Sequence, residues 1–177
     1  QTNCSPMLSP KSGGLPEATV DWPVDRLRFH LQSNPTKQEV TNCPLDLEVS
    51  FLPMDAIGEY GGLELEQTKK LEEVKDGYTY FANGDIIVAK ITPCFENGKG
   101  AIAASLVNGI AFGTTELHVL RPLPSLSMRF LFYLTISDHF RRIGTAYMYG
   151  AGGQKRVPED FIRNLRHPIP PIETQRA

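Results

Sequence analysis

The stretch GAGGQKRVPEDFIRNLRHPIPPIETQ, residues 150–175, decides how the rest of this chain is interpreted. It opens with a glycine-rich loop, residues 150–153, where glycine permits a positive φ and close approach of the backbone to another group. Gln154, Lys155 and Arg156 then place three long hydrogen-bonding side chains in a row. The pattern has two readings: an ordinary surface loop, or a flexible loop that presents these side chains to a polyanion.

The second half of the same stretch predicts a short helix and an extended exit. Pro158 to Leu165 is expected to be helical, because proline suits a first-turn position and Phe161 and Leu165 share one face. The prolines that follow, Pro168 to Pro171, favour an extended chain that cannot be a central strand.

Composition indicates one ordinary globular domain with an uneven distribution of charge. The chain has 177 residues, 41% of them hydrophobic, and a formal net charge of -2, which argues against indiscriminate coating of nucleic acid. Residues 39–76 carry ten acids against three lysines, a net of -7, whereas residues 141–166 carry six bases against two acids, a net of +4. A basic face near the C-terminal end is therefore possible, although a solvated charged surface is the default explanation of such clusters.

The cysteines and the hydropathy pattern suggest a cytoplasmic protein. Cys4, Cys43 and Cys94 are odd in number and far apart, which favours free thiols in a reducing compartment over a disulfide framework or a zinc site. No stretch is apolar and long enough to suggest a membrane span or a secretory signal. Residues 1–14 are expected to form a flexible N-terminal arm, and residues 15–177 the folded domain, with Trp22 in its core.

Alternating and continuous apolar runs predict a strand-rich α+β domain. One helix is expected from Ser127 to Ile143, capped by Ser125 or Ser127 and stopped by Gly144. Asn108-Gly109 is expected to turn one strand back on the next. The chain therefore reads as a single domain with a few helices and polar loops, and with strands in the ranges 47–52, 78–82, 85–91, 101–104, 110–113 and 117–122.

Four blocks of the sequence together resemble a known family. They are LPEATVDWPVDRLRF (15–29), NGDIIVAKITPCFENGKGAIA (83–103), GIAFGTTELHVLRP (109–122) and the closing PIPPIETQ (168–175). In this order and spacing they resemble the specificity subunit of Type I restriction-modification enzymes. The match is to one target-recognition domain, a fold with DNA-facing loops, and it covers Leu15 to Gln175.

The resemblance implies recognition of one half of a bipartite double-stranded DNA target by a chain that is not itself an enzyme. Such subunits carry two recognition domains separated by long spacer helices, whereas this sequence has one domain and stops at Ala177, where a spacer helix would begin. It would therefore be a fragment, or a half-subunit that needs a second recognition domain. The spacer helices bind methyltransferase subunits, which bring S-adenosylmethionine, and a nuclease/translocase subunit brings ATP and magnesium chemistry. No cofactor and no metal are expected in this chain itself.

Three loops carry side chains suited to DNA. Lys, Arg, Ser, Thr and backbone N–H groups bind phosphates, while Arg or Lys can read guanine and Asn or Gln adenine. For any one of these residues an ordinary solvated side chain is the better explanation, so we base the prediction on the set. We also expect charge reversal at Lys155 or Arg156 to weaken DNA binding without unfolding the domain. The candidates are Lys90, Thr92, Asn97, Lys99, Thr114, Thr115, Tyr149, Gln154, Lys155 and Arg156.

Two other classes of function stay open. A metal-dependent nuclease needs clustered carboxylates near a lysine, and Asp55 with Glu73-Val74-Lys75, or Asp85 with Glu96 and Lys99, could supply them, but such triplets are common by chance. The four histidines are isolated and show no metal-binding spacing. A protein-interaction module is the third class, because the acidic residues 39–76 could face a basic partner. Salt-sensitive, sequence-selective DNA binding would separate these readings.

Overall fold

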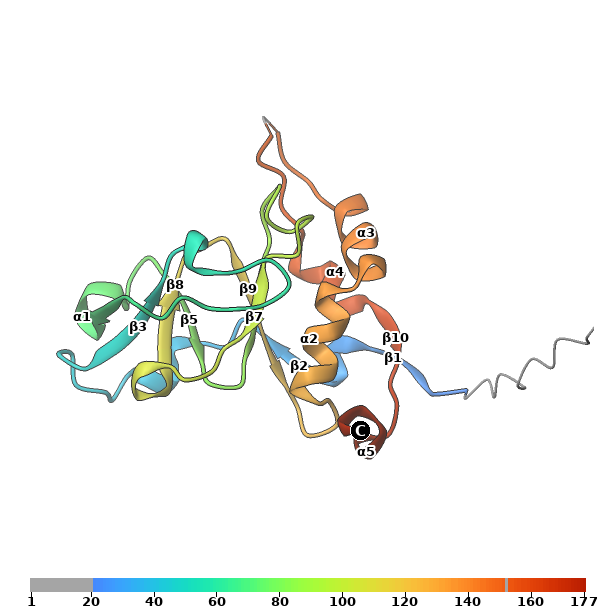
Figure 1. The fold of residues 1–177 in the computed structure, drawn as a ribbon, viewed down its shortest axis with the longest axis horizontal. Helices are drawn as coiled ribbons and strands as arrows, with labels where there is room; N and C mark the ends of the chain where they lie inside the picture. Colours follow the sequence, from blue (N-terminus) through green and yellow to red (C-terminus); the bar gives the residue numbers. More distant parts are fainter. Residues whose placement is uncertain (1–20, 152) are drawn as a thin grey trace, which may run out of the picture.

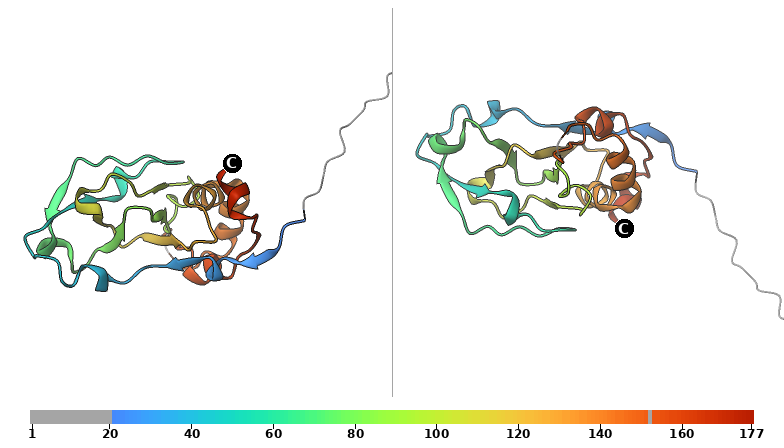
Figure 2. Two further views of the ribbon diagram at one scale, coloured as in Figure 1. Left: turned by 90° about the horizontal axis from the view of Figure 1, so that it is seen from below. Right: turned by 90° about the horizontal axis from the view of Figure 1, so that it is seen from above.

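The fold is described by a computed structural model that covers residues 21–151 and 153–177. The expected N-terminal arm, residues 1–14, and Cys4 lie outside the described residues. Two four-stranded sheets occupy one end of the molecule, and helices α2 to α5 gather at the other with a two-stranded ribbon (Figure 1). Figure 2 shows the same division from below and from above.

The first sheet has the strand order β2-β9-β6-β7, with every neighbouring pair antiparallel. Its central strand β6 is a continuous apolar run in which all four residues are buried, because both faces of a strand inside a layered core are covered. Ile86 and Val88 face the helices, whereas Ile87 and Ala89 face the second sheet. The strands are β2 (Leu31–Ser33), β6 (Ile86–Ala89), β7 (Gly100–Ile102) and β9 (Leu117–Pro122).

The second sheet has the order β4-β3-β8-β5, in which β3 and β8 are parallel and the other pairs antiparallel. One apolar core, with Phe81 and Leu52 from this sheet and Val119 from the first, fills the space between the two sheets. A second cluster, which includes Tyr80 and Phe112, packs on helix α1 (Leu71–Val74). The strands are β3 (Glu48–Leu52), β4 (Thr68–Lys70), β5 (Thr79–Ala82) and β8 (Ile110–Gly113).

The helical end packs on the first sheet through a third core, in which Val88 and Leu120 of the sheet meet Leu131, Phe140 and Phe161 of the helices. The helices are α2 (Met128–Ile136), α3 (Asp138–Ala146), α4 (Glu159–Asn164) and α5 (Ile172–Arg176). The ribbon pairs β1 (Val24–Arg26) with β10 (Arg166–Pro168). Short 3-10 turns are η1 (Leu27–Phe29), η2 (Lys37–Val40), η3 (Met54–Ala56) and η4 (Val107–Gly109).

The strand-rich α+β prediction is confirmed, but the single long helix is wrong. The chain leaves helical geometry at Ser137, where ψ is 146°. The Ser137 hydroxyl donates to Leu134 O at 2.8 Å and accepts from Phe140 N at 3.2 Å, so that it ends α2 and caps α3. Ser127 caps α2 as predicted. Gly144 does not end a helix: it lies within α3, where an added Cβ would come within 2.4 Å of the Phe95 ring.

Two other expectations are corrected by long-range packing. Trp22 is only partly buried, beside the C-terminal residues and Tyr133, and it is not in any of the three cores. The strands at 101–104 and 110–113 do not form a hairpin, because β7 pairs with β6 and β8 pairs with β3 and β5. The turn between them is tied to β3 by bonds from Val107 N to Ser50 Oγ and from Asn108 Nδ2 to Glu48 O, so the chain crosses to the other sheet there.

Candidate nucleic-acid interface

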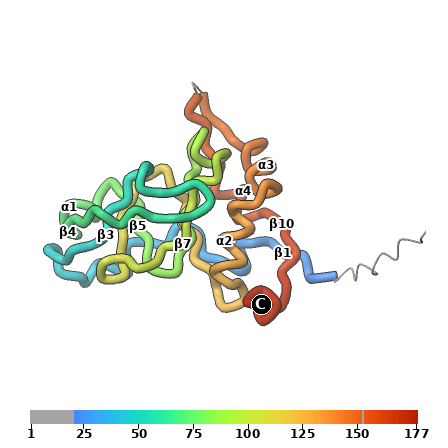
Figure 3. The backbone as a smooth tube through the Cα atoms, in the orientation of Figure 1, coloured from blue at the N-terminus to red at the C-terminus, as the bar shows by residue number. Residues whose placement is uncertain are grey.

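Residues 149–151 and 153–156, called here the 149–156 hairpin, project beyond both sheets next to the loop that follows β6 (Figure 3). Two backbone bonds close its base: Tyr149 N donates to Arg156 O at 3.2 Å, and Arg156 N donates to Tyr149 O at 2.9 Å. Gly150 has φ of 128°, and a Cβ there would lie 2.8 Å from Gln154 O. A side chain at this position would therefore open the hairpin.

The hairpin is attached to the loop that begins at Lys90. Thr92 N donates to Lys155 O at 2.9 Å, and Val157 N donates to Lys90 O at 2.8 Å. These bonds place Lys90 and Thr92 against the base of the hairpin. Two of the three loops that the sequence singles out are therefore neighbours in space, although Thr92 and Lys155 are 63 residues apart in the chain.

Glu116 joins the third loop to the other two. Its carboxylate accepts a two-point bond from Arg156, with Nη2–Oε1 at 2.7 Å and Nε–Oε2 at 2.8 Å. Its carbonyl accepts from Lys90 N at 2.9 Å, and its N–H donates to Thr114 Oγ1 at 3.2 Å. Hydrogen bonds from Arg156 hold the pKa of the Glu116 carboxyl below its usual value and raise the pKa of Arg156. This carboxylate therefore stays charged and paired at neutral pH.

Side chains free to bind a ligand gather on the hairpin. Gln154 and Lys155 are exposed, and within the described part of the chain neither side chain makes a hydrogen bond to another residue. Tyr149 is 64% exposed. The half-buried Lys90 lies beside the hairpin. Together these residues offer an amide, two ammonium groups and an aromatic ring to a ligand.

Other predicted residues are already engaged in holding the loops. Lys99 Nζ donates to Met54 O at 3.1 Å and to Ile57 O at 3.0 Å. Asn97 Nδ2 donates to the Glu59 carboxylate at 3.0 Å, and the Thr92 hydroxyl donates to the Glu96 carboxylate. These contacts give the three side chains a positioning role in the loop after β6.

Thr114 and Thr115 lie apart from the hairpin tip. They line a shallow pocket of about 310 Å³ together with Phe51 and Tyr78. Among the described residues, the neighbouring Glu116 connects this turn to the hairpin through its bond to Arg156. The ten predicted residues therefore do not surround a single point.

Sequence reasoning missed three residues of this region. Tyr60, 54% exposed, lies under the Arg141 guanidinium, which is 5.0 Å from the ring centroid and also donates to Glu96 O at 2.7 Å. Glu116 is the third. Glu116 could have been noticed as a single acid between two predicted strands, next to Thr114 and Thr115. Its partner Arg156 could not be predicted, because it is 40 residues away in the sequence. Arg141 was counted in the basic segment 141–166 but not as a site residue, and Tyr60 gave no local signal.

A pocket of about 340 Å³ lies beneath the hairpin and contains His118. His118 is 5% exposed, and its Nε2 lies 2.8 Å from Val157 O, so the Nε2–H tautomer donates to this carbonyl. Nδ1 is buried and has no partner among the described residues. Burial lowers the pKa of His118, because a second proton on Nδ1 would be a buried charge with no acceptor.

The stability of the domain is therefore expected to fall below pH 6.5 in a way that depends on His118. The folded-state pKa is depressed, so between about pH 6.5 and that value the unfolded chain binds a proton that the folded chain does not. Urea unfolding of the native chain and of His118→Gln at pH 7.5 and pH 5.5 measures this. The native chain should lose more unfolding free energy than the variant over this interval, and equal losses would contradict the assignment.

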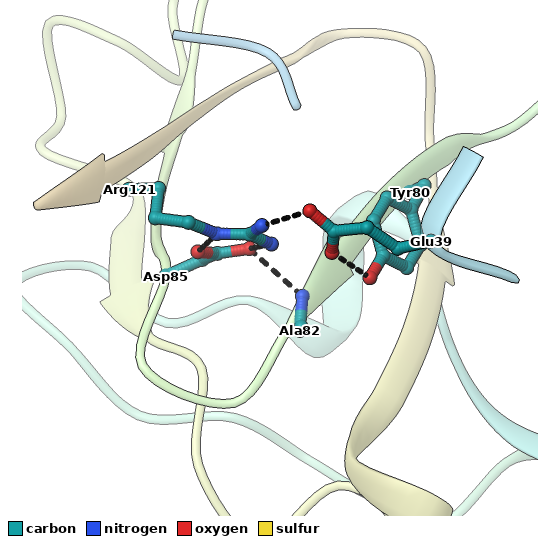
Figure 4. Close-up of polar contacts among 5 residues, drawn as sticks. All are labelled: Glu39, Tyr80, Ala82, Asp85 and Arg121. Atoms are coloured by element: carbon teal, nitrogen blue, oxygen red, sulfur yellow. Dashed lines mark hydrogen bonds and ion pairs between the residues drawn. The ribbon is translucent and has the colours of Figure 1, made fainter. Parts of the chain in front are cut away.

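Two of the acids that could have formed a nuclease site, Asp85 and Glu73, are engaged elsewhere. Asp85 binds Arg121 and the N–H of Ala82, and Glu39 joins Arg121 to Tyr80 (Figure 4). The Glu73 carboxylate accepts from the backbone N–H at the start of α1, 2.8 Å away. Among residues 21–151 and 153–177 no three His, Cys, Asp or Glu side chains are grouped so as to hold a metal ion. None of the helices in this described part is long and apolar enough to cross a lipid bilayer.

Two known proteins with similar sequences come from one kind of enzyme system. The chain is 49% identical over 130 residues to the specificity subunit of the Type I restriction enzyme EcoAI from Escherichia coli, which is 72% of this chain and 22% of that protein. It is 47% identical over 141 residues to the specificity subunit of EcoEI from the same species, 78% of this chain and 23% of that protein. The chain thus spans less than a quarter of these curated relatives. No family model matches the sequence.

Solved structures agree at the level of the fold. The HsdS subunit from Thermoanaerobacter tengcongensis superposes with a TM-score of 0.56 and 18% identity, over 94% of this chain and 37% of that one. A chain from a structure on complex assembly and conformational transition of the type I R-M system gives 0.58 and 18%, over 94% and 38%. The architecture of two sheets and a helical end is therefore shared with these proteins.

Proposed function

This chain belongs to the family of Type I restriction enzyme specificity subunits, and from that premise we propose that it recognises one half of a bipartite target in double-stranded DNA. The observation that supports this most strongly is the 149–156 hairpin. It presents Gln154 and Lys155 without partners among the described residues, next to Lys90 and the exposed Tyr149. A projecting two-stranded element of this kind is narrow enough to enter the major groove.

Each side chain has a distinct task in this proposal. Gln154 offers the amide that pairs with adenine, and Lys155 and Lys90 offer ammonium groups for phosphates or guanine. Tyr149 packs against sugars or bases. Lys99, Asn97 and Arg156, whose polar groups are bound within the protein, hold the loops in place and contribute to DNA binding through shape.

The partners follow from the same proposal. The chain carries no catalytic step, and methyltransferase subunits that bring S-adenosylmethionine act on the DNA it selects, with the target adenine flipped into their pocket. A nuclease/translocase subunit supplies the ATP- and magnesium-dependent steps. A second recognition domain reads the other half-site. The extended prolines before α5 orient the C-terminal end of this domain. In this proposal, that orientation sets the distance between the two half-sites.

DNA binding measured across a range of salt concentrations tests this function. The specificity subunit that contains this domain, assembled with its methyltransferase subunits, should bind its target duplex more tightly than a scrambled duplex. The logarithm of the binding constant should fall linearly with the logarithm of salt concentration, because phosphate contacts release counterions. Affinity that is the same for both duplexes would reject the proposal. Assembly with a protein partner combined with no DNA selectivity would favour an interaction module instead.

A further inference from the structure

We propose that Glu116 is a positioning residue for DNA discrimination: through its two-point bond to Arg156 it fixes the orientation of the 149–156 hairpin. The inference rests on the proposed function and assigns a role to a residue that does not itself have to touch DNA. A carboxylate at a DNA-facing surface repels phosphates, and both oxygens of Glu116 are bonded to Arg156, which favours a role in positioning Arg156 over a direct DNA contact.

The backbone alone fixes only the base of the hairpin. Bonds to the loop after β6 are made by the backbone groups of Lys155 and Val157, and the bridge to Ile91 involves Arg156. Farther out, the described residues 150, 151, 153 and 154 make no backbone bond to the rest of the protein. The orientation of these four residues therefore depends on the contacts that hold Arg156, at the end of the hairpin.

The Glu116–Arg156 pair provides that constraint. A guanidinium bound at two points to a carboxylate has a fixed plane as well as a fixed distance. Arg156 also donates from Nη1 to Gln154 O at 3.2 Å, which extends the constraint to the residue that presents the free amide. Glu116 in turn is held by its backbone bond with Lys90 and by Thr114, so the three loops share one anchor.

A positioning role and a simple stabilising role predict different results. If Glu116 orients the hairpin, Glu116→Gln should weaken binding to the target but leave binding to unrelated DNA unchanged or tighter, because a negative charge is removed. If the residue only stabilised the fold, both affinities would fall with the melting temperature. The ratio of the two dissociation constants is therefore the informative readout.

The experiment uses the complete specificity subunit with its methyltransferase subunits, and duplexes with the native or a scrambled half-site. Glu116→Gln and Arg156→Gln should each lower the discrimination ratio by roughly tenfold, the scale on which a misplaced base contact acts. The double variant should be no worse than either single, because both changes break one bond. Glu72→Gln, on the exposed side of α1, removes the same charge at a distance and should leave the ratio unchanged.

The outcomes separate the inference from the function on which it rests. An unchanged ratio in Glu116→Gln, equal weakening on both duplexes, or additive losses in the double variant would overturn the positioning role. Arg156→Gln supplies the same test if Glu116→Gln does not fold. Absence of discrimination in the native complex would instead reject the proposed function itself.

Discussion

Replacing Asp85 with alanine is expected to lower the free energy of unfolding by about 3 kcal/mol, the lower end of the cost of breaking a buried ion pair. Asp85 is 1% exposed and lies in the turn between β5 and β6. Its carboxylate binds Arg121 at 2.7 and 2.9 Å and accepts from Ala82 N at 2.8 Å. Alanine would leave this N–H without a partner and the Arg121 guanidinium with Glu39 as its remaining carboxylate partner.

The position of this network explains why the loss should be large. Arg121 belongs to β9 in the first sheet, while Ala82 and Tyr80 belong to β5 in the second, so the cluster in Figure 4 joins the two sheets. Burial raises the pKa of Tyr80 to about 12, and its hydroxyl donates to Glu39 at 2.7 Å. Hydrogen bonds from Tyr80 and Arg121 hold the pKa of Glu39 below its usual value, so this carboxylate keeps its charge at neutral pH.

Urea unfolding at pH 7 measures this expectation. Glu39→Gln is the matched comparison, because the Glu39 side chain is 46% exposed and an exposed ion pair contributes at most about 1 kcal/mol. The Asp85 variant should therefore be clearly less stable than the Glu39 variant. Equal losses of unfolding free energy in the two variants would show that the buried Asp85 does not stabilise the contact between the two sheets.

Replacing Lys155 with glutamate is expected to weaken DNA binding about tenfold without lowering the melting temperature, because a phosphate or base contact becomes a repulsion. The loss should apply to target and unrelated DNA, and the slope of the salt dependence should fall by roughly one to two. Lys155 is exposed, and its side chain has no bonded partner in the described part of the protein. Fluorescence anisotropy with the assembled subunit at several salt concentrations measures both quantities.

A lysine elsewhere on the surface provides the control for this experiment. Lys75, exposed at the end of α1, carries the same charge far from the hairpin, so Lys75→Glu should have a much smaller effect. Similar losses in both variants would mean that overall charge, and not the hairpin, governs binding. Charge reversal at Arg156 is not an equivalent test, because it would place two carboxylates together at Glu116. We therefore keep the prediction of an intact fold for Lys155→Glu and expect Arg156→Glu to lower the stability of the domain.

Local patterns in the sequence predict the elements well and their assembly poorly. The apolar run at 86–89 identified the central strand, and Ser127 marked the start of α2. The break at Ser137 was missed because apolar residues continue at helical spacing on both sides of it. Gly144 was taken as a helix end, whereas the space it leaves is occupied by Phe95, which is 49 positions earlier in the chain.

For the candidate site too, the sequence identified residue types but not their contacts. Residue types drew attention to the loops at 90–99, 114–115 and 149–156, and bonds of Glu116 with Lys90, Thr114 and Arg156 link these loops. They could not separate Lys155, which is free among the described residues, from Lys99, which is bonded to two carbonyls. Pairing of this kind depends on contacts between distant segments, and a local pattern of charges carries no information about it.

The most direct measurement of the central claim is the methylation pattern of the assembled enzyme. The complete specificity subunit, reconstituted with its methyltransferase subunits, would be compared with a version in which residues 150–155 come from a relative that recognises another sequence. Tyr149 and Arg156 are kept, so that the base of the hairpin and the bond to Glu116 are preserved. Sequencing of methylated adenines should give a bipartite motif in which one half changes and the other is retained. An unchanged motif in an active, folded enzyme would contradict the assignment of this hairpin as the DNA reader.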